Sequence, residues 1–131
     1  MSCPFIDADV IIRLLSQDDL AKQAEAAAPD TVIADAVYVL SSPRLYAKPC
    51  SEVAELLTPL VRLPGFRVRN RRIVLRALDL YAAINLDFSD ALIVASMERA
   101  NSDILYSYDT HFDRIPSITR RSPGSISLAE Q

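Results

Sequence analysis

The sequence has 131 residues and a net charge of −3; 50% of the residues are hydrophobic and 24% are charged. This length fits one domain, and the composition excludes a disordered chain. The negative charge argues against a generally basic coat for nucleic acid, and no apolar run approaches the ~20 residues of a membrane span. The two cysteines, Cys3 and Cys50, are too few for a disulfide framework and lack the spacing of metal ligands.

The start of the chain lacks the basic region and cleavage site of a signal peptide, so we expect a cytoplasmic protein. The mean hydropathy of +0.15 is high for a small soluble domain. This value suggests apolar surface that a partner covers.

The first elements are short. Residues 4–6 predict a strand that ends at Asp7. Asp9 is expected to cap a helix over residues 10–15, although its charge can instead add repulsion beside Asp7. An Ala-rich helix is expected from Asp18 to about residue 28, where Pro29 stops it.

A second strand is expected at residues 31–33, which are β-branched and short. It runs into Asp35, and residues 36–40 predict a mostly buried helix. Ser51 is expected to cap a helix over residues 52–62, with Pro59 kinking its last turn.

Residues 66–68 predict a third strand, and Asn70 is expected to cap a long helix whose apolar stripe covers residues 73–84. Asp87 or Ser89 can cap the next helix, which runs to about residue 100. Asp90 then lies in its first turn, where the helix dipole favours a carboxylate.

Residues 104–106 predict a fourth strand that ends shortly before Asp109, and Ile118 suggests a weak fifth. The predicted fold is α/β, a single domain over residues 1–131 with a core at about 4–121 and a frayed tail at about 122–131. Its centre is a parallel sheet of four to five short strands, flanked by helices on both faces.

Sites in such sheets form beyond the carboxyl ends of the strands. We therefore expect four carboxylates to meet at one rim of the sheet: Asp7, Asp35, Asp90 and Asp109. Carboxylates this close repel one another, so they protonate in part or hold divalent cations.

Oxygen ligands without Cys or His suit Mg²⁺ or Mn²⁺, which activate water for in-line displacement at a phosphodiester. His111 is the only histidine, which excludes a ribonuclease built on a histidine pair. A serine or cysteine triad lacks its base for the same reason, unless His111 serves.

The sequence resembles the PIN-domain family in four motifs, most closely its VapC-type toxin endoribonucleases. The motifs run in family order over residues 5–10 with 13–15, 35–40, 86–93 and 107–112. The resemblance implies a Mg²⁺-dependent ribonuclease that acts on RNA, is commonly a homodimer and is neutralised by a VapB-like antitoxin.

Position by position, the resemblance implies that Asp7 and Asp90 are the principal metal ligands. Asp109 would complete the cluster, Asp35 would fill the second acidic position, and Ser107 would bond a ligand carboxylate or a metal-bound water. Two residues depart from the family pattern: Asp35 stands where Glu is usual, and Asp9 stands where Asn is usual. Asp9 and Asp87 would act only as support, mainly as helix caps.

Other functions stay open. A catalytically silent PIN-like binding module for RNA or protein is the main alternative, because of the two departures. A phosphoacceptor receiver domain also gathers acids at strand ends, but it needs a Lys near the last strand, and no Lys follows Lys48.

An arginine-rich segment is the one dense positive patch in the sequence. Its members are Arg67, Arg69, Arg71, Arg72 and Arg76. Arg69, Arg72 and Arg76 share a helical face if the helix starts early, and they are candidate contacts for the RNA backbone. The simpler interpretation is a solvated helix start.

Overall fold

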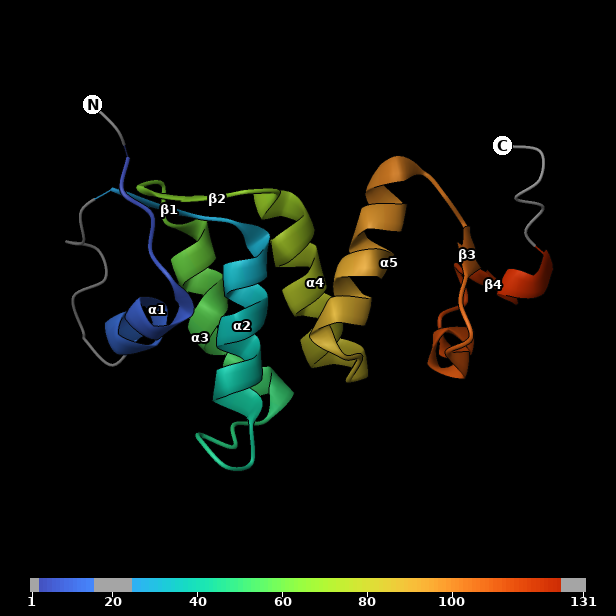
Figure 1. Ribbon diagram of the computed structural model, residues 1–131, viewed down its shortest axis with the longest axis horizontal. Coiled ribbons are helices and arrows are strands. Elements are labelled where there is room, and N and C mark those ends of the chain that lie inside the picture. Colours follow the sequence, from blue (N-terminus) through green and yellow to red (C-terminus); the bar gives the residue numbers. More distant parts are fainter. Residues whose placement is uncertain (1–2, 16–24, 126–131) are drawn as a thin grey trace. The chain divides into compact units, whose positions relative to one another are not determined.

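The computed structural model describes residues 3–15 and 25–125 (Figure 1). The chain divides into a first unit, Met1–Ser96, and a second unit, Met97–Gln131, with the boundary inside helix α5 (Phe88–Ala100). In the described ranges, no helix has the length and apolar character needed to cross a membrane.

Parallel strands organise the first unit. Strand β1 (Ala26–Ala28) pairs with β2 (Phe66–Val68), and Phe5 forms a parallel bridge to Ala27 on the other side of β1. The backbone N–H of Ile6 donates to the Ala27 oxygen at 2.9 Å, and the Ala27 N–H donates to the Pro4 oxygen at 2.8 Å. Residues 66–68 therefore form the predicted strand beside β1, whereas the strand predicted at residues 4–6 is reduced to a single bridge at Phe5.

The second strand lies earlier in the chain than predicted. Residues 31–33 belong to helix α2 (Asp30–Ser41), and residues 26–28, predicted as the end of a helix, form β1. The buried side chains of α2 are Ile33, Ala36, Val37 and Leu40, spaced three, four and seven apart, which is a helical period. This period outweighs the strand preference of the β-branched residues. Residues 18–24 of the predicted helix lie outside the described residues.

The sequence analysis predicted that Asp9 caps helix α1 (Ala8–Leu15). In the structure, Asp7 caps this helix instead. The backbone N–H of Val10 donates to Oδ1 of Asp7 at 3.1 Å. Asp9 lies in the first turn, where its charge suits the helix dipole.

Helices α3 (Cys50–Arg62) and α4 (Arg71–Ile84) pack against each other, and each buries five side chains in the core. Both helices were predicted within two residues. Figure 1 shows α2 and α3 descending from β1 and β2, which they contact. The Cys50 thiol donates to Oδ1 of Asn85 at 3.0 Å, which joins the start of α3 to the end of α4.

Asparagines occupy the ends of α4. Asn70 precedes the helix and Asn85 follows it, both in the left-handed region with φ of 58° and 53°. The prediction that Asn70 is the cap residue is correct in position, but its side chain makes no capping hydrogen bond to the helix. Its amide instead donates to Asp30 at 3.4 Å.

Helix α5 begins directly after Asp87, whose backbone oxygen accepts from the Ala91 N–H at 2.8 Å. The ring of Phe88 meets the ring of Tyr81 edge to face, with centroids 6.0 Å apart. This aromatic pair fixes the start of α5 against α4.

The second unit contains a second parallel pair, β3 (Ile104–Tyr106) with β4 (Thr119–Arg121). These are the predicted fourth strand and, one residue later than expected, the weak fifth. Between them lies the 3₁₀ helix η2 (Thr110–Arg114), and another, η3 (Pro123–Ser125), follows β4 in a tail that was predicted to fray. Residues 126–131 of that tail lie outside the described range.

The predicted α/β class with short parallel strands is confirmed. Hydrogen bonds between named strands join them in two pairs, β1 with β2 and β3 with β4. That all strands form one central sheet in a single domain stays a prediction.

Tyr81 gives the first unit a testable response to alkali. Burial raises the pKa of Tyr81 to about 12, and the Cys50 thiol contributes to the rise. A group whose pKa is higher in the folded state contributes stability that is fully present below its unfolded pKa of ~10 and is lost as the pH rises toward 12. The unfolding free energy of the parent protein should fall between pH 9 and 12, and in Tyr81→Phe this fall should be smaller by roughly 1–2 kcal/mol. Urea titrations at several pH values measure this fall.

The matched control is Tyr38→Phe, because Tyr38 is 73% exposed on α2. The control variant should keep the slope of the parent protein. If Tyr81→Phe also keeps that slope, ionisation of Tyr81 is not coupled to unfolding.

Candidate metal centre and nucleic-acid interface

Asp7 lies where the segment at residues 4–6, which bridges to β1 at Phe5, turns into α1. Its side chain is exposed, and Oδ1 is held by the Val10 N–H. This hydrogen bond fixes the direction of the carboxylate without burying it. Asp7 is therefore an oriented carboxylate that closely follows the parallel bridge of Phe5.

The other acids of the first unit lie on different helices. Asp35, expected just beyond a strand, lies in the second turn of α2 and is exposed. Asp90 lies in the first turn of α5, as predicted from the sequence. Its side chain is half-buried. Asp9 and Asp87 are exposed beside the starts of α1 and α5.

Asp109 belongs to the second unit and caps η2. Its Oδ1 accepts from the His111 backbone N–H at 2.9 Å and lies 2.6 Å from Nδ1 of the same residue. The Ser107 hydroxyl accepts from the Asp109 N–H at 3.0 Å. Ser107 therefore holds the backbone of the Asp109 loop. Its contact with a ligand carboxylate or a metal-bound water stays a prediction.

Hydrogen bonds govern the electrostatics of this loop. The His111 backbone N–H, followed by its ring, lowers the pKa of Asp109 below its usual value. Arg120 lowers the pKa of Asp113 in the same way, through a hydrogen bond of 2.8 Å. Both carboxylates are therefore charged at neutral pH, which a cation ligand requires.

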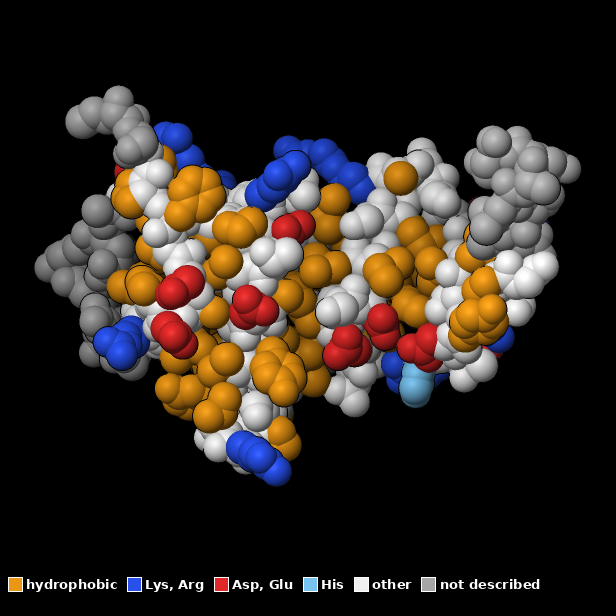
Figure 2. Space-filling view, viewed as in Figure 1, with side chains coloured by type: hydrophobic (Ala, Val, Ile, Leu, Met, Phe, Trp, Pro, Cys, Tyr) orange, Lys and Arg blue, Asp and Glu red, His pale blue; other side chains and the backbone are white. Residues whose placement is uncertain are grey.

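The four carboxylates are distributed over both units. In neither unit do three Asp, Glu, His or Cys side chains gather closely enough to hold a metal, among the residues described. Figure 2 shows carboxylates over α1 and α2 as separate groups on this face. The meeting of all four acids at one rim stays a prediction.

The arginines of the positive segment have unequal surroundings. Arg71 is half-buried, and its guanidinium donates to the backbone oxygens of Leu63 and Phe66, so it holds the turn before β2. Arg69 and Arg72 are exposed. Because α4 begins at Arg71, Arg69 lies before the helix, and the condition for a shared helical face with Arg72 and Arg76 is not met.

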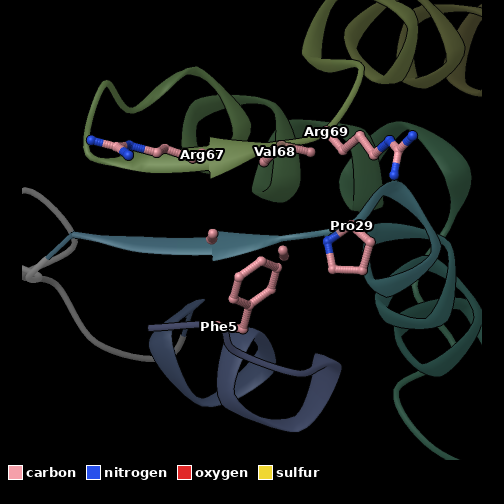
Figure 3. A pocket seen from close by; sticks show the side chains of 7 residues that line it. Phe5, Pro29, Arg67, Val68 and Arg69 are labelled. Atoms are coloured by element: carbon pink, nitrogen blue, oxygen red, sulfur yellow. The ribbon is translucent and has the colours of Figure 1, made fainter. Parts of the chain in front are cut away.

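A surface pocket of about 350 Å³ lies along the strands of the first unit. Figure 3 shows Phe5 and Pro29 beside β1, with Arg67 and Arg69 at opposite ends of the pocket. Sequence reasoning missed this site, because Phe5 was assigned only to a strand. The alternation in β2, where Arg67 is exposed between buried Phe66 and Val68, is the signal that could have found it.

The donor chemistry of the acids fits a hard divalent cation. Asp7, Asp35 and Asp90 offer carboxylate oxygens from exposed or half-buried positions, as Mg²⁺ and Mn²⁺ prefer. Arginines lie in the same unit and suit phosphate. The described residues thus offer the kinds of donor that a divalent cation and a phosphate group prefer, without a gathered cluster.

Comparison with known families identifies the family of the chain. The model of the PIN domain family matches residues 5–118, and the chain therefore belongs to the PIN domain family. PIN domains are generally nucleases and generally use divalent metals.

A comparison with solved structures found a chain of a toxin–antitoxin complex from Klebsiella pneumoniae. It shares 18% identity with this chain at a TM-score of 0.35, over 90% of this chain and 96% of that one. No curated protein matches the sequence.

The capping bond of Asp7 separates its structural role from any role in metal binding. Asp7→Ala removes the acceptor of the Val10 N–H, so the unfolding free energy without metal should fall by about 1 kcal/mol. Asp7→Asn keeps an acceptor and should change stability little, because Asn caps helices as well as Asp. Urea denaturation in EDTA measures both changes. An equal loss for Asp9→Ala would contradict the assignment of Asp7 as the cap.

Proposed function

We propose that this PIN domain is a Mg²⁺- or Mn²⁺-dependent endoribonuclease, the toxin of a toxin–antitoxin pair. It cleaves RNA phosphodiester bonds by attack of water. The supporting observation is the family match over residues 5–118, within which the four motif acids occur in family order. The orientation of Asp7, close after the parallel bridge of Phe5, agrees with this proposal.

In this proposal Asp7 and Asp90 hold the metal, Asp109 completes the ligand set, and Asp35 fills the second acidic position. The metal supplies activation of water and neutralisation of charge on the phosphodiester. Asp7 contributes a carboxylate already directed by α1, and Ser107 positions the Asp109 loop. Arg69, Arg72 and Arg76 draw the RNA backbone toward acids that would otherwise repel it.

We further propose that the protein is a homodimer whose partner is a VapB-like antitoxin. Large apolar side chains support a covered surface on the first unit. Val10 is 40% exposed on α1, and Tyr38, Leu45 and Tyr46 are 73%, 60% and 52% exposed on α2 and the following loop. Their burial by a partner removes apolar area from water.

A catalytically weak or silent binding module is the second candidate. It is favoured by the shorter Asp35 in place of Glu and by the separation of acids within each unit among the described residues. Both candidates bind RNA or protein; only the nuclease needs its acids for turnover.

The experiment that tests the nuclease measures metal binding and cleavage together. Mn²⁺ should raise the melting temperature of the parent protein by several degrees, because a ligand at 100 times its Kd adds about 2.7 kcal/mol to stability. Asp90→Asn should lose most of this shift. The parent should cleave RNA with Mn²⁺ and stop when EDTA is added.

Asp79→Asn is the matched control, since Asp79 is exposed on α4 and is not a motif residue. It should keep both the shift and the cleavage. Equal Mn²⁺ shifts in Asp90→Asn and the parent would exclude Asp90 from the metal site. A metal shift without cleavage of total RNA would favour the silent module.

Asp35 can be tested by lengthening its side chain. Asp35→Glu extends the carboxylate by roughly 1.5 Å and should keep or raise Mn²⁺-dependent cleavage. Asp35→Ala should lower cleavage about tenfold or more. The exposed position within α2 tolerates both changes, because Glu and Ala favour helix more than Asp does. Equal loss in the two variants, measured as initial rates, would show that the position requires Asp.

A further inference from the structure

One arginine of the second unit joins both ends of the loop that carries Asp109. Arg120 lies in β4, and its side chain is 21% exposed. Its Nε and Nη2 donate to the two carboxylate oxygens of Asp113 at 2.8 and 3.3 Å. Its Nη1 donates to the backbone oxygen of Ser107 at 3.0 Å. The guanidinium therefore spans the loop from its first residue, directly after β3, to the 3₁₀ helix η2.

The first end of this loop is held through three polar groups of Ser107. Its backbone N–H donates to the Arg121 oxygen at 3.0 Å, which extends the pairing of β3 with β4 by one residue. Its backbone oxygen accepts from Arg120, and its hydroxyl accepts from the Asp109 N–H at 3.0 Å. Because the peptide unit is planar, the bond to the Ser107 oxygen fixes the direction in which the chain continues toward Asp109.

The other end of the loop is η2, and Asp109 is its cap residue. Oδ1 of Asp109 accepts from the His111 backbone N–H at 2.9 Å and lies 2.6 Å from Nδ1 of its ring. The direction of this carboxylate therefore depends on where η2 lies. Asp113 of η2 takes the two bonds from Arg120, and Phe112 beside it in the chain is buried. A bidentate contact between guanidinium and carboxylate fixes orientation as well as distance.

We propose that Arg120 is a positioning residue for Asp109, the acid that completes the ligand set of the proposed metal site. It acts through Ser107 and Asp113 and touches neither the cation nor the RNA. This inference rests on the proposed ribonuclease function. Removal of a group that orients a metal ligand lowers metal affinity by about 10–100-fold. A contact that only stabilised the fold would leave the affinity of the folded protein unchanged.

Charge and position predict opposite effects of Arg120 on metal affinity. Arg120→Gln removes a positive charge, and by Coulomb's law the loss of a nearby cation favours the binding of another. If Arg120 positions Asp109, the same variant should instead bind Mn²⁺ about tenfold more weakly, because the loop must be ordered on binding. Isothermal titration calorimetry of the full chain measures the affinity, at a temperature where circular dichroism shows each variant to be folded.

Two further variants test the geometry of the fork. Arg120→Lys keeps the charge, but its single nitrogen does not reproduce a fork that holds Ser107 and Asp113 together, so it should also bind Mn²⁺ more weakly. Asp113→Asn breaks the charged contact at η2 and keeps the contact to Ser107. Its affinity should fall between those of the parent and Arg120→Gln.

The matched control is Arg121→Gln, which removes the same charge one residue further along β4. Arg121 is exposed and contacts Ser107 through its backbone oxygen, which the substitution keeps. Its Mn²⁺ affinity should equal or slightly exceed that of the parent. A loss as large as that of Arg120→Gln would contradict a specific role for Arg120.

Amide hydrogen exchange, followed by NMR in EDTA, tests the same contacts without metal or RNA. The N–H groups of Asp109 and His111 both donate to acceptors inside the loop. Exchange at both should be about tenfold faster in Arg120→Gln, because local opening then breaks fewer charged hydrogen bonds. The Ala91 N–H, which donates to Asp87 in the first unit, should keep its rate.

The outcomes separate this inference from the function on which it rests. If the parent binds Mn²⁺ and cleaves RNA but folded Arg120→Gln binds Mn²⁺ as tightly or more tightly, the positioning role is wrong and the ribonuclease stands. If the parent neither binds Mn²⁺ nor cleaves RNA, both proposals are wrong. Should Arg120→Gln fail to fold, Arg120→Lys and Asp113→Asn decide, because parental Mn²⁺ affinity in both folded variants also overturns the proposal.

Discussion

Parallel pairing of three short segments is the constraint on which the first unit depends. Pro4 and Ile6 bond to Ala27, and the Arg69 N–H donates to the Ala28 oxygen at 3.1 Å. Because the segments run in one direction, their carboxyl ends lie at one edge, and the residues that follow them are brought there by the backbone alone. Asp7 and Arg69 owe their positions to this pairing, and so does the alignment of Phe5, Ala27 and Arg67.

Asp7 illustrates how an acid of the proposed metal site can also serve a short helix. Helix α1 has eight residues, too few to be stable by itself, and its first turn depends on the Asp7 cap. A carboxylate is retained here at little cost, since the helix start needs an acceptor at that position in any case. In this arrangement, structure and the proposed metal site require the same side chain.

The sequence predicted the elements whose pattern is long and regular. Helices α3 and α4 were predicted from apolar periodicity, and α5 from a continuous apolar run that follows capping residues. Strands β2 and β3 were predicted from short apolar runs between turns. The prediction for residues 26–33 was wrong for two reasons. Three alanines carry little strand preference, so β1 was not predicted. The β-branched residues that follow suggested a strand, although the helical period of α2 extends beyond them. For the site, motif order identified the acids, but the Phe5 pocket depends on register between strands distant in sequence, which no local pattern contains.

The chain has only two glycines, yet several turns need a left-handed residue. Asn70, Asn85 and Asn101 supply it, with φ of 58°, 53° and 58°, and Asn101 ends α5 as the Ser102 N–H reaches back to Met97 at 2.9 Å. Asparagine adopts this region at lower cost than other side-chain-bearing residues, but it is less free than glycine before folding. The helix ends thus lose less backbone entropy on folding than glycines would. The stability of these turns therefore depends on the conformational entropy of the unfolded chain as well as on contacts in the native one.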